Sequence, residues 1–85
     1  MNERGDGMPS ASVRLTNRQA EVLRLAAKGL VAKEIAHSLG ISVRTVEGHL
    51  SEMRRVTGAK NMAELIAWGV TTGVILTGSA VLGHR

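Results

Sequence analysis

Apolar residues recur every three or four positions along most of this chain, and that spacing predicts helices. The clearest case is Val43, Val46, Leu50 and Met53, which would lie in one apolar stripe on a helix over 43–57. Similar patterns predict three further helices, between Thr16 and Gly29, over 32–39 and over 62–72. The chain is therefore expected to fold as an all-α domain of four helices.

The expected helix ends carry residues that suit capping. Thr16 is followed three residues later by Gln19, and Asn61 by Glu64, and both pairs have the spacing of a capping box. Ser42 fits the N-cap of the helix over 43–57. The residue after a helix often needs a positive φ, which glycine adopts readily. The predicted stops are Gly29, Gly40, Gly58 and Gly73.

The helices over 32–39 and 43–57 are joined by a short turn, and the second has a polar side. With Val46 pointing inward, the side chains that point most nearly outward are those of Arg44, Gly48, Ser51 and Arg55. Arginine can form bidentate pairs with guanine edges, and a helix–turn–helix places such a face in the DNA major groove. The alternative is an ordinary solvated face on a helical hairpin, since surface helices usually have a charged outer side.

Composition narrows the class of protein. The chain has 85 residues, no cysteine and one aromatic residue, Trp68, so we expect one small domain whose core is aliphatic. Without cysteine there is no disulfide framework and no thiol nucleophile, which suits a reducing cytoplasm, the location we expect. The formal net charge of +4 favours an anionic partner, nucleic acid before an anionic membrane surface.

The two ends of the chain differ from its middle. Residues 1–14 are mostly polar and are expected to form a disordered leader, and residues 76–85 an apolar, frayed tail. The run 65–83 has no charged residue, and a membrane span is an alternative for it. We prefer a dimerisation helix over 62–72, because glycine, threonine and serine interrupt the run. Gly69 is expected to weaken this helix by up to about 1 kcal/mol relative to alanine.

The order of these elements is specific enough to compare with known families. The residues that carry the resemblance are Leu15, Thr16, Arg18, Glu21, Val22, Leu23, Gly29, Lys33, Glu34, Ile35, Ala36, Leu39, Ile41, Ser42, Thr45, Val46, His49, Gly58, Gly73, Val74 and Ile75. With this pattern, residues 15–75 resemble the helix–turn–helix DNA-binding domain of LuxR-type (GerE-like) bacterial transcription regulators. The resemblance implies that the third helix enters the major groove. It also implies that the fourth helix pairs two domains on a pseudo-palindromic site in double-stranded DNA.

The resemblance assigns Lys33 and His49 to phosphates and places Arg44, Thr45, Ser51 and Arg55 at or near the groove. Our full set of candidate DNA-binding residues is Lys33, Ser42, Arg44, Thr45, Glu47, Gly48, His49, Ser51, Arg54 and Arg55. Our candidate homodimer interface is Met62, Leu65, Ile66, Trp68, Gly69 and Thr72.

The chain also departs from the family pattern. Val31 stands where a small polar cap is usual, and Glu47, Val56 and Met62 stand where positive residues are common. Fewer positive charges mean fewer phosphate contacts, so we expect weaker non-specific binding to DNA than a typical member shows. The hypothesis that the helix over 43–57 reads DNA depends on Arg44 and Arg55, whose guanidinium groups must be free to contact a nucleotide edge.

We therefore expect a sequence-specific, dimeric transcription regulator, with RNA polymerase or another regulator as further candidate partners. We expect no catalytic residues, no cofactor and no metal, because no histidine or carboxylate pair has convincing ligand or acid–base spacing. The alternative from another class is an adaptor that keeps the fold but binds a protein through its apolar tail. Resemblance to a family is a safer guide to the fold of this chain than to its function.

Overall fold

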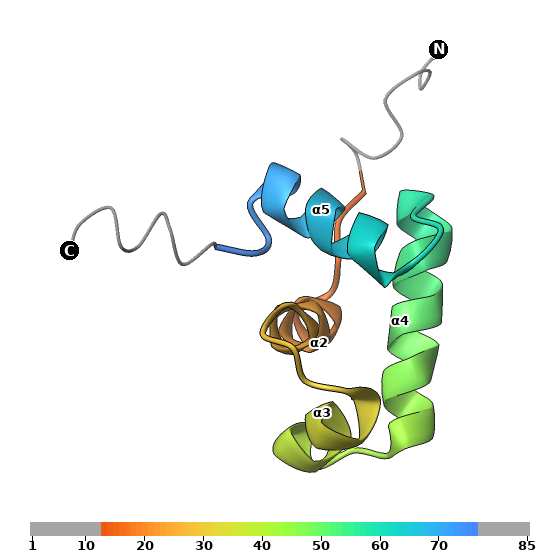
Figure 1. The fold of residues 1–85 in the computed structure, drawn as a ribbon. Coiled ribbons are helices and arrows are strands. Elements are labelled where there is room, and N and C mark those ends of the chain that lie inside the picture. Colours follow the sequence, from red (N-terminus) through yellow and green to blue (C-terminus); the bar gives the residue numbers. More distant parts are fainter. Residues whose placement is uncertain (1–12, 77–85) are drawn as a thin grey trace, which may run out of the picture.

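The computed structural model describes residues 13–76, and this part of the chain contains helices and no strand. The helices are α2 (Asn17–Ala27), α3 (Ala32–Leu39), α4 (Val43–Thr57) and α5 (Met62–Thr72). In Figure 1, α4 forms one side of the molecule, with α3 at one end of it, α5 at the other and α2 between them. The prediction of a four-helix, all-α domain is confirmed.

Side-chain caps set most of the helix starts. The Thr16 hydroxyl accepts from the Gln19 N–H at 3.1 Å and the Gln19 side chain accepts from the Thr16 N–H at 3.0 Å, so this capping box is confirmed. At α5, the Asn61 side chain accepts from the Glu64 N–H at 2.9 Å. The Glu64 carboxylate, however, accepts from the N–H of Lys60, one residue before the cap, at 2.8 Å. The Asn61 cap is thus confirmed, and the reciprocal bond is displaced by one residue.

The start of α3 has no side-chain cap, because Val31 occupies the N-cap position. Its N–H donates to the Glu34 carboxylate at 2.9 Å, which is the half of a capping box that needs no polar side chain at the cap. The Val31 side chain itself is 62% exposed. The predicted stops are confirmed, with φ between +69° and +97° at Gly29, Gly40, Gly58 and Gly73.

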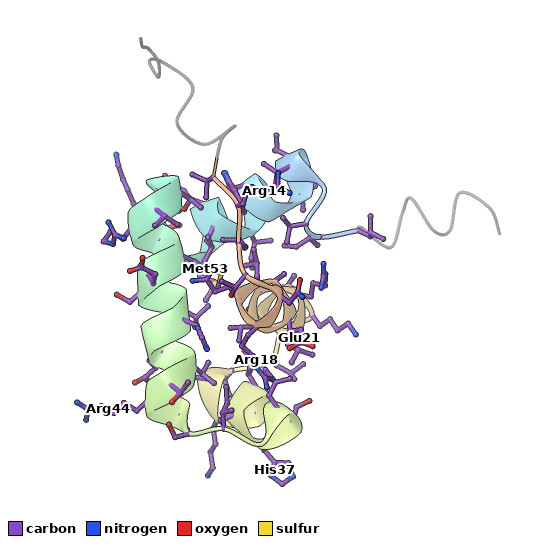
Figure 2. All side chains as sticks on the ribbon, turned by 180° about the vertical axis from the view of Figure 1, so that it is seen from behind. Arg14, Arg18, Glu21, His37, Arg44 and Met53 are labelled. Carbon is purple, nitrogen blue, oxygen red and sulfur yellow. The ribbon has the colours of Figure 1, made fainter. Side chains whose placement is uncertain are left out.

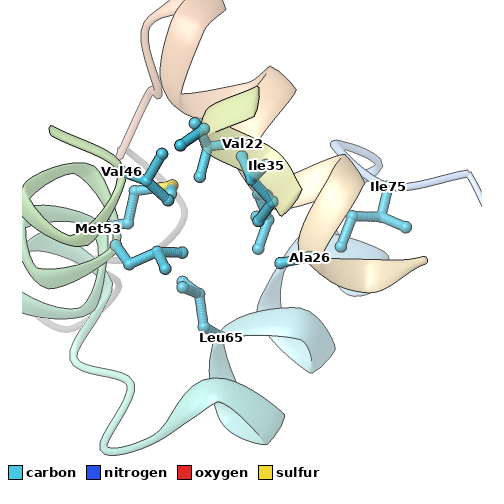
Figure 3. Packing of buried hydrophobic residues seen from close by; sticks show 10 residues of the cluster. Val22, Ala26, Ile35, Val46, Met53, Leu65 and Ile75 are labelled. Atoms are coloured by element: carbon cyan, nitrogen blue, oxygen red, sulfur yellow. The ribbon is translucent and has the colours of Figure 1, made fainter. Parts of the chain in front are cut away.

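All four helices contribute to one hydrophobic core (Figure 3). The predicted stripe on α4 is confirmed for Val46, Leu50 and Met53, which are buried. It is wrong for Val43, which is 38% exposed because it begins α4 beside the turn from α3, one turn before the core. The largest fully buried side chains are those of Val22, Leu23, Ile35, Val46, Met53 and Leu65.

After α5 the chain folds back onto the body as a short strap, residues 73–76. Ile75 is buried, and its N–H donates to the carbonyl oxygen of Gly69 at 2.9 Å. The Arg24 side chain on α2 donates through Nε to the carbonyl oxygen of Val74 at 3.0 Å. Leu76, the first residue of the expected tail, is 79% exposed. The strap therefore joins α5 to α2.

The remaining predictions about the two ends lie outside the described residues, since they concern 1–12 and 77–85. Val13 and Arg14 are described and belong to no helix. Within 13–76, none of the helices has both the length and the apolar character needed to cross a membrane.

Candidate nucleic-acid interface

The turn between α3 and α4 fixes the orientation of the two helices. The N–H of Ile41 donates to the carbonyl oxygen of Ala36 at 3.0 Å, which closes the end of α3 at Gly40. The Ile41 side chain is half-buried and packs against the core. Ser42 then caps α4, because its hydroxyl accepts from the Thr45 N–H at 3.0 Å. The pair α3–turn–α4 therefore forms a helix–turn–helix.

One side of α4 is buried and the opposite side faces solvent. The buried side chains Val46, Leu50 and Met53 hold the helix to α2, α3 and α5. The Arg44 side chain points away from the body of the protein (Figure 2). The four positions that were expected to point outward, Arg44, Gly48, Ser51 and Arg55, are all exposed.

The other candidate contact residues lie around this face. Ser42, Thr45 and Glu47 are exposed at the start of α4, and Lys33 is exposed in the first turn of α3. His49 and Arg54 are half-buried at the flanks of the helix. The candidate residues of α4 thus lie on its exposed side or at the flanks of that side. Lys33 lies on the neighbouring helix α3.

The expectation that both outer guanidinium groups are free is wrong for Arg55. Its Nε donates to Glu52 Oε1 at 3.0 Å and its Nη2 to Glu52 Oε2 at 2.6 Å. Glu52 was not among the candidate residues. A glutamate three residues before an arginine is a favourable helical ion pair, and that spacing is the sequence signal that could have identified it.

This ion pair shifts the pKa of both groups in the direction that favours their charged forms. The hydrogen bonds from Arg55 hold the pKa of the Glu52 carboxyl below its ordinary value, and the positive charge acts in the same direction. Glu52 in turn raises the pKa of Arg55 above its ordinary value, again mainly through the hydrogen bonds. Both side chains are largely solvated, so the pair adds little to the stability of the fold.

The candidate dimer interface needs a correction. Leu65 is fully buried within the chain and Gly69 packs against Ile75 and Leu23, so neither is available to a second copy. Met62, Ile66 and Trp68 are half-buried, and Thr72 is exposed. The indole Nε1 of Trp68 is buried and has no hydrogen-bond partner among residues 13–76. The pattern predicted an apolar helix here but not which of its sides packs inward.

The outer side of α5 carries small and apolar residues that the sequence reasoning did not select. Ala63, Ala67, Val70 and Thr71 are exposed, and they follow one another at spacings of four, three and one. These spacings place them on one side of the helix. The exposed Glu64 lies at the edge of this strip, three residues before Ala67 and seven before Thr71.

Residues 13–68 match the family of bacterial regulatory proteins described as the luxR family. The chain belongs to the LuxR family. The match covers α2, α3 and α4 and most of α5, which are the elements that build the helix–turn–helix and its support.

Relatives of this LuxR-family domain are transcriptional regulators. The chain is 45% identical over 62 residues to the transcriptional activator protein AhyR of Aeromonas hydrophila, covering 73% of this chain and 24% of AhyR. It is 49% identical over 47 residues to the C4-dicarboxylate transport transcriptional regulatory protein DctR of Rhodobacter capsulatus, covering 55% of this chain and 24% of DctR. It is 41% identical over 56 residues to the oxygen regulatory protein NreC of Staphylococcus aureus, covering 66% of this chain and 26% of NreC. The matched region thus amounts to about a quarter of each of these relatives.

Proposed function

We propose that this chain is a sequence-specific DNA-binding transcription regulator whose helix α4 enters the major groove. The observation that carries the proposal is the division of α4 into a buried side, with Val46 and Met53, and an exposed polar side that includes Arg44 and Ser51. A helix held rigidly by its apolar side can present polar side chains to base edges at fixed positions. Membership of the LuxR family supports the same function.

Binding would start with electrostatic attraction and end with base reading. The chain carries a net charge of +4, which would attract duplex DNA, and the exposed Lys33 in the first turn of α3 would contact a phosphate. Arg44 points into solvent and would reach a base edge in the groove. The helix α4 itself has three arginines and two glutamates, so its own charge contributes little to non-specific affinity.

We further propose that two copies pair through the outer side of α5. This side includes the exposed Ala63, Ala67 and Val70, with Ile66 half-buried beside them. Small residues allow two helices to approach closely. A symmetric dimer would then place two α4 helices on half-sites about one helical turn apart, in a pseudo-palindromic duplex.

The proposal is tested by selecting bound sequences from random duplexes and then titrating the selected duplex at several salt concentrations. We expect affinity to fall as salt rises. Replacing both Arg44 and Arg55 by alanine should lower affinity about tenfold or more, because a good base contact contributes about 1–3 kcal/mol. Arg18→Ala is the matched control, since Arg18 is exposed and ion-paired with Glu21 on α2 at 3.3 Å.

Two results would contradict the proposal. One is unchanged duplex affinity in the double arginine variant. The other is no binding of the wild-type chain to any duplex at low salt, which would favour the protein-binding adaptor instead. For the dimer, Ala67→Glu should convert a dimer into a monomer in sedimentation experiments, whereas Ser38→Glu on the exposed side of α3 should not.

A further inference from the structure

The arginine near the end of α4 is engaged side-on by a carboxylate. Arg55 uses Nε and Nη2 to donate to the two oxygens of Glu52, at 3.0 Å and 2.6 Å. The side chains are 70% exposed for Arg55 and 46% exposed for Glu52. Both residues belong to α4, so the rigid helix backbone fixes the distance between them.

This geometry leaves part of the guanidinium group unused. Arginine has five N–H donors in a planar fork, and the side-on pair with Glu52 occupies two of them. The remaining three donors lie on Nη1 and Nη2, along the end of the group. Two parallel donors of this kind match the O6 and N7 acceptors of guanine in the major groove. Arg55 can therefore keep its bonds to Glu52 and still form a bidentate pair with a guanine.

A phosphate contact would be less favourable for the same side chain. The three free donors of Arg55 could also meet a phosphate, but that contact would bring a second negative charge close to the Glu52 carboxylate, whereas a guanine edge carries no net charge. Like charges at such short range repel, and little of this repulsion is screened within a Debye length. The pair therefore favours the base edge over the backbone.

We propose that Glu52 is a positioning residue that makes Arg55 a reader of guanine instead of a phosphate contact. The inference rests on the proposed function, in which α4 enters the major groove. It assigns a role to an acidic residue on a face that would otherwise be expected to carry positive charge. The operator should therefore contain, in each half-site, a guanine whose recognition depends on Glu52 through Arg55.

The same helix offers a matched control in Glu47. Glu47 is exposed on α4, and no hydrogen bond or ion pair of its side chain is found among residues 13–76. Glu47→Gln and Glu52→Gln remove the same charge from the same helix. Only the second variant releases Arg55.

The test uses the 85-residue chain and the duplex obtained by selection, with each G·C pair replaced in turn by A·T. We expect one position per half-site where replacement lowers wild-type affinity about 5- to 150-fold. Replacing that guanine with 7-deazaguanine, which lacks the N7 acceptor, should also weaken binding. Glu52→Gln should reduce this discrimination and strengthen binding to random-sequence duplex, with a salt slope steeper by about 0.9 as Arg55 gains a phosphate.

Two further variants separate geometry from charge. Glu47→Gln should strengthen binding to random duplex and keep the guanine preference at the same position. Arg55→Lys keeps the positive charge but lacks the planar fork, so it should lose the guanine preference and keep the salt dependence. Circular dichroism checks that each variant is folded.

The outcomes distinguish the two proposals. If the wild-type chain binds no duplex, the proposed function and this inference both fail. If the wild type binds a selected site but Glu52→Gln and Glu47→Gln have the same effect on guanine discrimination, this inference is overturned and the proposed function stands.

Discussion

The side chain of Ile75 lies directly against the backbone of Gly69, and the Ile75 N–H donates to the Gly69 carbonyl oxygen at 2.9 Å. A β-carbon added at Gly69 would lie 2.6 Å from Ile75 Cδ1 and 3.0 Å from Leu23 Cδ2. The first distance is shorter than real carbon contacts, and the second is tighter than most of them, so the neighbouring side chains would have to shift. The glycine therefore permits the strap after α5 to reach the core between α5 and α2.

Gly69→Ala should destabilise the protein by about 1 kcal/mol, because overpacking costs about 1–3 kcal/mol and alanine returns only about 1 kcal/mol of helix propensity. The fluorescence of Trp68, the single tryptophan, reports urea unfolding. In a chain that already carries Ile75→Ala, Gly69→Ala should cost less stability, because most of the overpacking is removed. If Gly69→Ala were more stable than the wild type, the strap would be able to move aside without loss of folding free energy, and the prediction would be wrong.

Gly48→Ala should have the opposite effect on stability. Gly48 lies inside α4 with nothing within 4 Å of an added β-carbon, so alanine should stabilise the fold by up to about 1 kcal/mol. The same variant should bind the selected duplex more weakly, because the methyl group would occupy space where the groove approaches α4. Urea unfolding and a duplex titration measure the two effects on one preparation. Unchanged affinity for the duplex would exclude Gly48 from the DNA contact surface.

Most of the fold could be predicted from local chemistry. Caps such as Thr16 and Ser42, and stops such as Gly40, act within a few residues, so the sequence alone indicates where most of the helices begin and end. The side of α4 that faces solvent also followed from its spacing. The ion pair between Glu52 and Arg55 is equally local, and its i, i+3 spacing was visible in the sequence.

The errors in α5 arose where a residue's role depends on distant parts of the chain. Gly69 weakens an isolated helix by propensity alone, but here it makes room for Ile75. Leu65 lies on an apolar helix whose periodicity does not say whether a neighbour or a second copy covers it. The bond from Arg24 to Val74 joins residues 50 positions apart, and no local pattern predicts it.

The caps of α4 and α5 provide a matched pair for stability and binding. Ser42→Ala and Asn61→Ala each remove a side chain that accepts from a backbone N–H, at 3.0 Å and 2.9 Å. Each should cost about 1 kcal/mol of stability. Only Ser42 lies at the start of the proposed recognition helix, so only Ser42→Ala should also weaken duplex binding at a temperature where both variants are folded. Equal affinity of the two variants would exclude Ser42 from the interface.

The pKa of Glu52 provides a direct test of its bond to Arg55 in solution. The hydrogen bonds from Arg55 lower this pKa from its ordinary value. The stabilisation from the pair is therefore fully present above the ordinary carboxyl pKa, and it is lost as the pH falls through the lower value of the folded protein. Carboxyl NMR titration should show the pKa of Glu52 below the ordinary carboxyl value, and Arg55→Gln should return the Glu52 pKa toward that value. The effect on unfolding should be small, because both groups are solvated. A Glu52 pKa that does not change in Arg55→Gln would mean that the pair is absent in solution, and the guanine-reading role would lose its basis.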